Sequence, residues 1–255
     1  NRKSWRSSII ADRWLSFFYS WASASRIAWY FARTWPETIG NSLMKIIGLT
    51  GSIAAGKSTV AGWIRDLGIA IHDADEAVHE LLSPHGVAVN AILAEFETDL
   101  AGHDIGNFEK GINRQALGNY VFARPQARQT LELILHPLVR QHRDAFLDKH
   151  RSIAAPAVVL DVPLLFETGG DAVCDHIIVV HASAETTAKR ALARVGMTSA
   201  KLAAILASQM PVDVKKKRAD LCLDSDLQPD ETRQDLIKWL AKFHVPMNGS
   251  DQAQS

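Results

Sequence analysis

The residues best suited to chemistry lie in one short stretch, "GSIAAGKST". It fits the pattern G-x-x-x-x-G-K-[ST] at every fixed position, with two glycines, a lysine and a serine. In this pattern, backbone N–H groups surround phosphate oxygens, the lysine reaches the β- and γ-phosphates, and the hydroxyl binds Mg²⁺. The stretch therefore predicts a site for ATP or another nucleoside triphosphate, with Mg²⁺ on Ser58. The site consists of Gly51, Ser52, Ile53, Ala54, Ala55, Gly56, Lys57, Ser58 and Thr59.

The sequence on either side of this loop supplies the structure that the pattern requires. The apolar run "KIIGLT" directly before it is typical of a buried strand. After it, Val60, Ile64 and Leu67 follow helical spacing, and Gly68 is a suitable end for the helix. A strand before and a helix after favour a phosphate loop over a chance glycine turn.

Two carboxylates end the second predicted strand, "IAIHDAD". Residues two apart in an extended chain project to the same side, and ligands bind near the carboxyl ends of parallel strands. Asp73 and Asp75 could therefore accept a proton from a hydroxyl that attacks the γ-phosphate. For Asp73 a second interpretation stays open, because Asp73 and Glu76 match a helix capping box. For Asp75 the catalytic interpretation is favoured.

Two arginines, Arg190 and Arg194, are four residues apart in a predicted helix and should share one face. Such a pair could close on the triphosphate and stabilise charge on the transferred group. The alternative is an ordinary solvated helix face. The surrounding sequence predicts two helices that break near Gly196, and together they form an expected lid over residues 185–212.

Further apolar runs alternate with helical patterns along the chain: "APAVVLDVPLLF", "HIIVVHA" and "ADLCLDS". The predicted fold class is α/β, a P-loop NTPase-like parallel five-stranded sheet flanked by helices. A helical substrate-binding insert is expected at residues 76–153. Within it, Pro137 should kink or restart a helix near His136.

Composition limits the classes of function. The net charge is zero, which gives no support for nucleic acid as a partner. No run of 18 apolar residues exists, so a transmembrane helix is not expected. The two cysteines, Cys174 and Cys222, have no metal-ligand spacing and are expected to be buried thiols in a reducing cytoplasm.

Residues 1–43 differ from the rest of the chain. They hold six of the basic residues against two acidic ones and five of the seven tryptophans, and the first methionine is Met44. A targeting peptide, a membrane-surface helix and upstream sequence from a wrongly chosen start are the three interpretations, and we favour the last. The expected organisation is this extension, a kinase domain over 44–245 and a disordered tail over 246–255.

In order and spacing, "GLTGSIAAGKSTVAGWIRDLGIAIHDAD", "GINRQALGNYVFARPQARQTLELILHPLVR", "VVLDVPLLFETG", "AKRALAR" and "QMPVDVKKKRADLCLDS" resemble the dephospho-CoA kinase family over Met44 to about residue 242. The resemblance implies ATP-dependent phosphorylation of the 3′-hydroxyl of dephospho-CoA, which gives coenzyme A and ADP. It also implies a phosphate-loop core, a helical substrate lobe and a lid.

The resemblance implies roles for individual residues. Asp75 matches the family's general base and Arg190 matches an arginine on the transferred phosphate, while Lys57, Ser58 and Thr59 match nucleotide and Mg²⁺ contacts. The expected substrate contacts are Thr50, Asp75, His136, Arg140, Pro163, Leu164, Leu165, Glu167 and Lys215.

The sequence departs from the family pattern at several positions. Ser52 and Ala54 replace glycines of the loop, which strains the backbone where φ is positive. His72 replaces an aliphatic residue. Ser225 stands where the family often has Asn, which puts an adenine-side contact in doubt.

Two rival functions stay open from the sequence. One is a kinase for another nucleoside or nucleotide, and the other is a nucleotide-binding switch that has lost turnover. Retention of a base beside the phosphate loop argues against a pure binder. The expected partners are ATP and dephospho-CoA, without nucleic acid or membrane for residues 44–255, in a cytoplasmic monomer or weak homo-oligomer.

Overall fold

The computed structural model describes residues 44–243 except 97, 100–103 and 123. The extension and tail expected from the sequence lie outside these residues. The described chain divides into two compact units. We call residues 73–148 the insert unit, and residues 44–72 with 149–243 the nucleotide unit.

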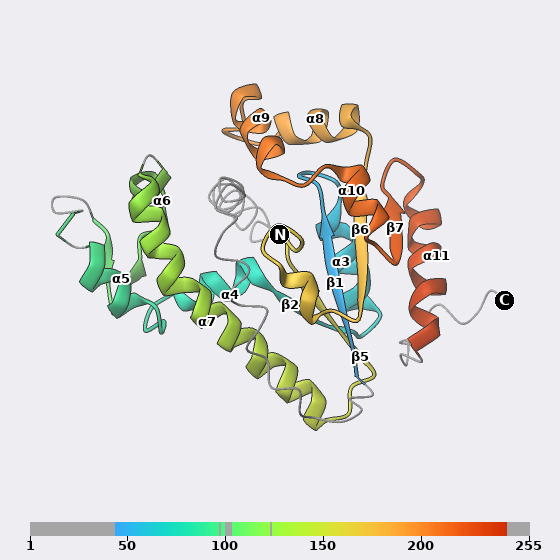
Figure 1. The fold of residues 1–255 in the computed structure, drawn as a ribbon, viewed down its shortest axis with the longest axis horizontal. Coiled ribbons are helices and arrows are strands. Elements are labelled where there is room, and N and C mark those ends of the chain that lie inside the picture. Colours follow the sequence, from blue (N-terminus) through green and yellow to red (C-terminus); the bar gives the residue numbers. More distant parts are fainter. Residues whose placement is uncertain (1–43, 97, 100–103, 123, 244–255) are drawn as a thin grey trace, which may run out of the picture. The chain divides into compact units, whose positions relative to one another are not determined.

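The nucleotide unit is built on a parallel five-stranded sheet in the order β2-β5-β1-β6-β7 (Figure 1). The predicted fold class is thereby confirmed. One predicted strand was too long, because β5 ends at Asp161 and the segment from Pro163 onward turns away. A proline has no N–H for the ladder, which explains this end. The strands are β1 (Lys45–Gly51), β2 (Ala70–Asp73), β5 (Ala157–Asp161), β6 (His176–His181) and β7 (Leu221–Asp224).

Alternation along β6 shows why both faces of the sheet are covered. Ile178 and Val180 join one buried cluster with residues of helices α3 and α11, whereas Ile177 and Val179 join another with Leu165. The helices of this unit are α3 (Lys57–Asp66), α8 (Ala184–Leu192), α9 (Ser199–Ser208), α10 (Val212–Lys217) and α11 (Pro229–Leu240), with short 3-10 turns at Gly170–Val173 and Ala241–Phe243.

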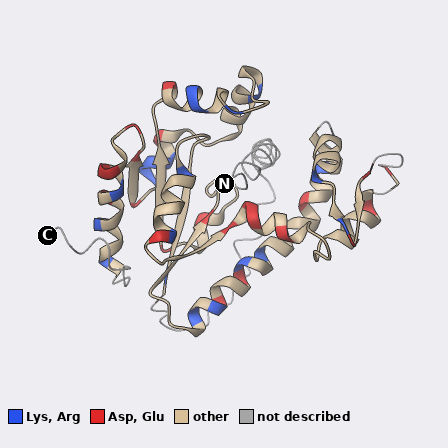
Figure 2. Cartoon of the chain, turned by 180° about the vertical axis from the view of Figure 1, so that it is seen from behind, with Lys and Arg blue, Asp and Glu red and all other residues tan. Residues whose placement is uncertain are grey.

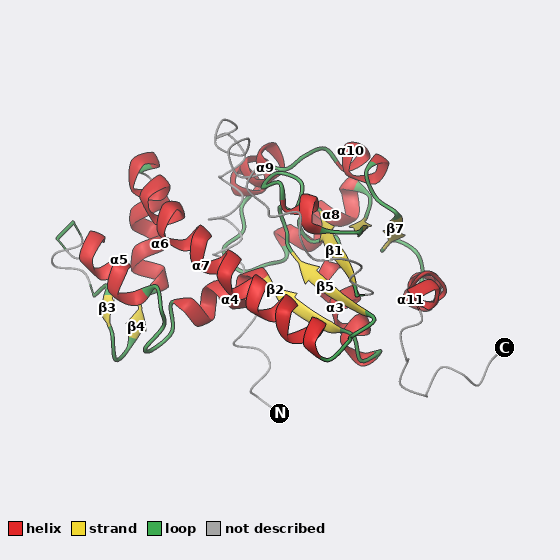
Figure 3. Ribbon diagram, turned by 60° about the horizontal axis from the view of Figure 1, so that its bottom comes forward, coloured by secondary structure: helices red, strands yellow, loops and turns green. Residues whose placement is uncertain are grey.

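The insert unit is mostly helical and also contains a small hairpin. Strands β3 (Gly106–Asn107) and β4 (Gly111–Ile112) pair antiparallel and form a two-stranded sheet of their own (Figure 3). Strands of two residues leave no periodic pattern to detect in a sequence. The helices are α4 (Ala74–Leu81), α5 (Val89–Phe96), α6 (Arg114–Phe122) and α7 (Pro125–Ser152), the last of which runs into the other unit.

Helix α7 corrects one prediction. Pro137 was expected to kink or restart the helix, and the restart is wrong, because a single helix continues through it. Proline removes the hydrogen bond to the carbonyl four residues earlier, which belongs to Leu133. Leu133 is 67% exposed, so water can bind that carbonyl and the helix can continue.

Two further expectations concerned the burial of the cysteines and the absence of a transmembrane helix. Cys174 is half-buried, but Cys222 is exposed on β7, so the expected burial was wrong for Cys222. Within the described part of the chain, no helix is both long and apolar enough to cross a bilayer.

Candidate active site

The phosphate loop lies between the end of β1 at Gly51 and the start of α3 at Lys57. Gly56 caps α3 with a left-handed backbone, at φ 90°. A Cβ added there would lie 3.3 Å from the Cβ of Ser225, so both conformation and space favour glycine. Helix α3 therefore begins as the loop pattern predicts, with its first N–H groups and positive dipole end available to an anion.

The two departures from a glycine-rich loop differ in consequence. Ala54 has φ 56°, in the left-handed region where a Cβ costs about 1–2 kcal/mol. Ser52 is not among the described residues with positive φ. The strain expected from the sequence is thus present at Ala54.

Lys57 is in ion-pair contact with Asp161 at the end of β5, the strand beside β1. The lysine side chain is 20% exposed and the aspartate side chain 3% exposed. The pair holds the ammonium group at the loop. Asp161 was not predicted as a site residue. Its place at the end of a strand in "VVLDVPLLFETG" could have indicated it, because ligands bind at the carboxyl ends of parallel strands.

Several residues expected to touch substrate are buried in this structure. Thr50 is fully buried, and its hydroxyl donates to the carbonyl of Pro163 at 3.0 Å. Leu164 and Leu165 are at most 2% exposed. Their side chains are enclosed in this structure, and the contact of Thr50, Pro163, Leu164 and Leu165 with substrate stays a prediction.

Glu167 and Lys215, also expected on the substrate side, face each other. Their Oε1 and Nζ atoms lie 2.7 Å apart, with side chains 5% and 0% exposed. The contact is an ion pair by distance, but its angle is not that of a hydrogen bond. The basic run "KKKR" at residues 215–218 therefore has one wholly buried member, Lys215.

Arg190 lies in the last turn of α8 and reaches toward the loop. Its guanidinium donates to the hydroxyl of Ser225 at 2.8 Å and to the Ser225 carbonyl at 3.0 Å. A Cβ built on Gly56 would be 3.9 Å from the same guanidinium. Ser225, the unusual residue of this position, thus holds Arg190 beside the phosphate loop.

The prediction that Arg190 and Arg194 share one helix face is wrong. Helix α8 ends at Leu192, so Arg194 lies in the turn that follows. The predicted break near Gly196 is confirmed, with φ 81° at that glycine.

The N-terminal end of α8 is capped by Ser183. The N–H of Ser183 donates a hydrogen bond to Asp226 at 2.7 Å, and this bond keeps the pKa of Asp226 below its ordinary value.

In the insert unit, Asp73 caps α4. Its Oδ1 accepts hydrogen bonds from the N–H groups of Asp75 and Glu76 at 2.9 and 3.2 Å. The capping interpretation therefore holds for Asp73. Asp75 lies in the first helical turn rather than in an extended strand, so the expected strand geometry was wrong.

The same unit holds the last two predicted substrate contacts. His136 and Arg140 are four residues apart on α7 and so share a face. Burial, followed by the positive charge of Arg140, lowers the pKa of His136. This histidine is therefore neutral at pH 7 and can both donate and accept a hydrogen bond.

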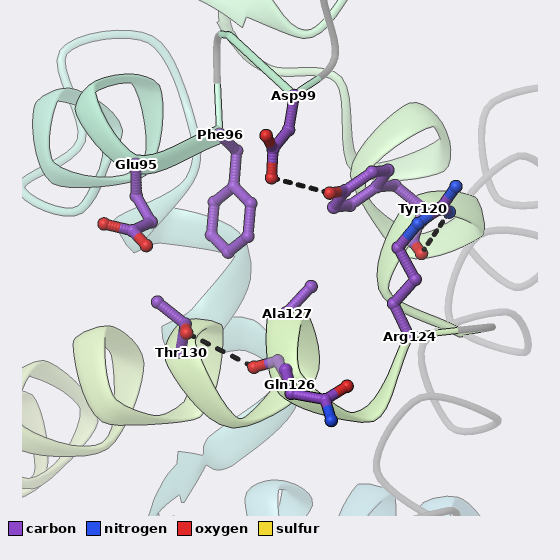
Figure 4. A pocket seen from close by; sticks show the side chains of 8 residues that line it. All are labelled: Glu95, Phe96, Asp99, Tyr120, Arg124, Gln126, Ala127 and Thr130. Atoms are coloured by element: carbon purple, nitrogen blue, oxygen red, sulfur yellow. Dashed lines mark hydrogen bonds between the residues drawn. The ribbon is translucent and has the colours of Figure 1, made fainter.

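A separate pocket of about 290 Å³ lies within the insert unit (Figure 4). The Tyr120 hydroxyl donates to Asp99 at 2.7 Å, and the Arg124 guanidinium lies 4.3 Å from the Tyr120 ring centre. None of the residues predicted from the sequence lines it. The lining residues are Glu95, Phe96, Asp99, Tyr120, Arg124, Gln126, Ala127 and Thr130.

Comparison with known proteins decides the family. The family model described as dephospho-CoA kinase matches residues 45–231, which is most of the chain. The chain belongs to the dephospho-CoA kinase family. A dephospho-CoA kinase of Rhodospirillum rubrum is 50% identical over 184 residues, covering 72% of this chain and 84% of the relative. One from Mesorhizobium japonicum is 46% identical, covering 71% and 88%.

Solved structures agree with this membership of the dephospho-CoA kinase family. A crystal structure from Thermus thermophilus has 30% sequence identity and a TM-score of 0.63, covering 78% of this chain and 97% of that one. A dephospho-CoA kinase from Campylobacter jejuni has 25% identity and a TM-score of 0.56, covering 79% and 98%. The resemblance found in the sequence is therefore confirmed at the level of family and fold.

Proposed function

We infer that this protein is a dephospho-CoA kinase, which uses ATP to phosphorylate the 3′-hydroxyl of dephospho-CoA and releases coenzyme A and ADP. This inference depends on the phosphate loop in a chain of this family. Lys57 of the loop contacts Asp161, and Arg190 of the lid lies beside the loop. The reaction is the last step of coenzyme A synthesis.

Binding of ATP changes the partner of Lys57. In the structure its ammonium group lies at Asp161, a carboxylate in the next strand. Because the lysine is partly exposed, it can turn to the β- and γ-phosphates while the N–H groups at the start of α3 bind phosphate oxygens. Asp161 thus keeps the lysine at the loop until the nucleotide arrives.

We propose that Arg190 contacts the phosphoryl group during transfer. Ser225 already holds its guanidinium next to Gly56, so little side-chain entropy is lost when ATP binds. A fixed cation at this point stabilises the charge on the transferred phosphoryl group. Arg194, in the turn after α8, remains a proposed ATP contact through movement of that turn.

The residues at the loop fit Mg²⁺. Ser58 is exposed in the first turn of α3, and Asp161 supplies a carboxylate at the neighbouring strand end. Hydroxyl and carboxylate oxygens suit this cation, which usually takes its other ligands from phosphates and water. When bound with ATP, Mg²⁺ neutralises charge on the β- and γ-phosphates. In the described ranges, no group of three or more His, Cys, Asp or Glu side chains could hold a metal ion.

We propose Asp75 as the general base. The 3′-hydroxyl oxygen forms a bond to the γ-phosphorus, the bond from that phosphorus to the bridging oxygen of ADP breaks, and the hydroxyl proton passes to Asp75. His136 and Arg140 are proposed to bind the acceptor. Asp73 acts through its cap, which fixes the first turn of α4 in which Asp75 lies.

The activity is tested by ADP release from the purified chain with Mg·ATP and one of four additions: dephospho-CoA, adenosine, AMP or no acceptor. We expect turnover that requires dephospho-CoA and gives a product of coenzyme A mass. Turnover on another acceptor alone would contradict the assigned substrate and retain phosphoryl transfer. For the base, Asp75→Asn should abolish most turnover while ATP still binds, and near-normal turnover would contradict its role.

We also propose the surroundings in which this activity occurs. A cytoplasmic kinase domain over 44–245, monomeric or weakly oligomeric, fits the small soluble substrates of the reaction. Basic and acidic residues are mixed along α7, and both signs also occur in α3, α8, α10 and α11 (Figure 2). With a net charge of zero, this mixture favours small-molecule partners over nucleic acid or a membrane.

A further inference from the structure

The end of the second lid helix is joined to the phosphate loop by a buried side chain. Gln209 directly follows α9, and its Oε1 accepts a hydrogen bond from the N–H of Ile53 at 3.2 Å. Gln209 is 8% exposed and Ile53 1% exposed. A buried amide N–H of the loop therefore has its acceptor on the lid segment, and losing that acceptor would leave the N–H unsatisfied.

The residues around Gln209 fix its position. The N–H of Met210 donates to Glu167 Oε1 at 2.7 Å, and Lys215 lies 2.7 Å from the same oxygen. Glu167 follows β5 and Lys215 lies in α10, so two further elements hold the segment after Gln209. A buried carboxylate needs such a cation and N–H donor to be stable.

From this connection we propose that Gln209 is a positioning residue, which ties the end of the lid to the phosphate loop and orders the loop for ATP. The Glu167–Lys215 pair supports it and does not touch substrate. The proposal rests on the proposed function, because ATP is the ligand for which the loop is ordered. Loop order before binding raises affinity, since less entropy is lost on binding.

Gln209→Met tests the connection, because methionine has nearly the same shape but is not an effective acceptor for the Ile53 N–H. We expect the KM for ATP to rise at least about fivefold, the KM for dephospho-CoA to stay within about twofold, and the thermal shift caused by ATP to shrink. Ser208→Ala is the matched control. It removes the neighbouring hydroxyl, which bonds the Ile205 carbonyl at 2.7 Å, and should change neither KM.

Amide exchange gives a readout that needs no turnover. The Ile53 amide should be protected in the unmodified chain without nucleotide and should exchange faster in Gln209→Met, while β6 keeps its protection. An unprotected Ile53 amide in the unmodified chain would overturn the proposal, even if the variant did not fold. An unchanged KM for ATP in a folded Gln209→Met variant would also overturn it. These results are independent of which acceptor the enzyme uses.

The double variant Glu167→Gln with Lys215→Met tests the supporting pair. The amide oxygen introduced in place of the Glu167 carboxylate would still accept from the Met210 N–H, and no unpaired charge would be left inside. We expect both KM values within about threefold of the unmodified enzyme. A rise of tenfold or more in the KM for dephospho-CoA alone would show that the pair contacts substrate, and would overturn the supporting role.

Discussion

Two lysine–carboxylate pairs lie in the nucleotide unit, and they differ in access to solvent. Lys57, paired with Asp161, is 20% exposed at the phosphate loop, whereas Lys215, paired with Glu167, is fully buried. A partly exposed cation can exchange its carboxylate partner for a phosphate. A buried cation that left its partner would leave a buried carboxylate without a counter-charge, which is strongly destabilising. The same residue types thus serve ligand binding in one region and internal support in the other.

Lys57→Met should have the largest effect on activity. It removes the cation that meets the β- and γ-phosphates, so we expect kcat/KM to fall by about 10²–10³-fold. Lys57→Met also leaves a buried carboxylate, that of Asp161, without its cation. The thermal midpoint should still change less than in Lys215→Met, because water can reach Asp161 through the partly exposed position of Lys57, whereas the position of Lys215 is closed to solvent. Steady-state kinetics and thermal unfolding on one preparation measure both. A midpoint loss equal to that of Lys215→Met would remove the distinction between the pairs.

Lys215→Met should show the reverse pattern. It leaves the Glu167 carboxylate buried without its cation, which costs about 3–5 kcal/mol of unfolding free energy and lowers the midpoint by about 6–20 °C. The kcat of the folded fraction should fall far less than in Lys57→Met. Lys217→Met, an exposed neighbour in the same basic run, is the control and should leave the midpoint unchanged. Equal destabilisation by both variants would contradict the assignment of burial as the cause.

The contrast between the pairs also marks what the sequence could predict. Lys57 was found because strand, loop and helix follow one another, and each is specified by residues close in the chain. The burial of Lys215 depends on Glu167, 48 positions earlier, which no local pattern reveals. The sequence also did not reveal that α8 ends before Arg194, because helix propensity alone favours continuing the helix past Leu192.

The same distinction holds for the acidic residues. Asp73 was open between catalysis and capping because the sequence motif fits both. The hydrogen bonds to two N–H groups show the cap, and the catalytic role stays a prediction. Asp161 was missed since its partner, Lys57, lies at the start of α3, 104 positions earlier in the chain. The five-stranded sheet was predictable because the central strands β1, β5 and β6 are mostly apolar, while the two-residue strands of the insert unit gave no such pattern.

Ser225→Ala extends the comparison to a third cation, Arg190. It removes one of two acceptors that hold the guanidinium by the loop, so we expect the KM for ATP to rise by about three- to tenfold. Ser225→Thr keeps the hydroxyl and should remain within twofold. If the alanine variant behaved like the unmodified enzyme, the contact would exist only before ATP binds, and Arg190 would belong with Lys57 among the exchangeable cations.

The smallest effect is expected from Ala54→Gly in the loop itself. Glycine accepts the left-handed backbone at φ 56° without a Cβ conflict, so the unfolding free energy should rise by up to about 1 kcal/mol. Ala55→Gly is the matched control, because Ala55 is buried and is not among the described residues with positive φ. That variant should lose about 0.5–1 kcal/mol. Denaturant unfolding measures both, and opposite signs at adjacent positions would show that strain at Ala54 is local. Equal signs would mean that loop flexibility, rather than the backbone angle of Ala54, controls stability here.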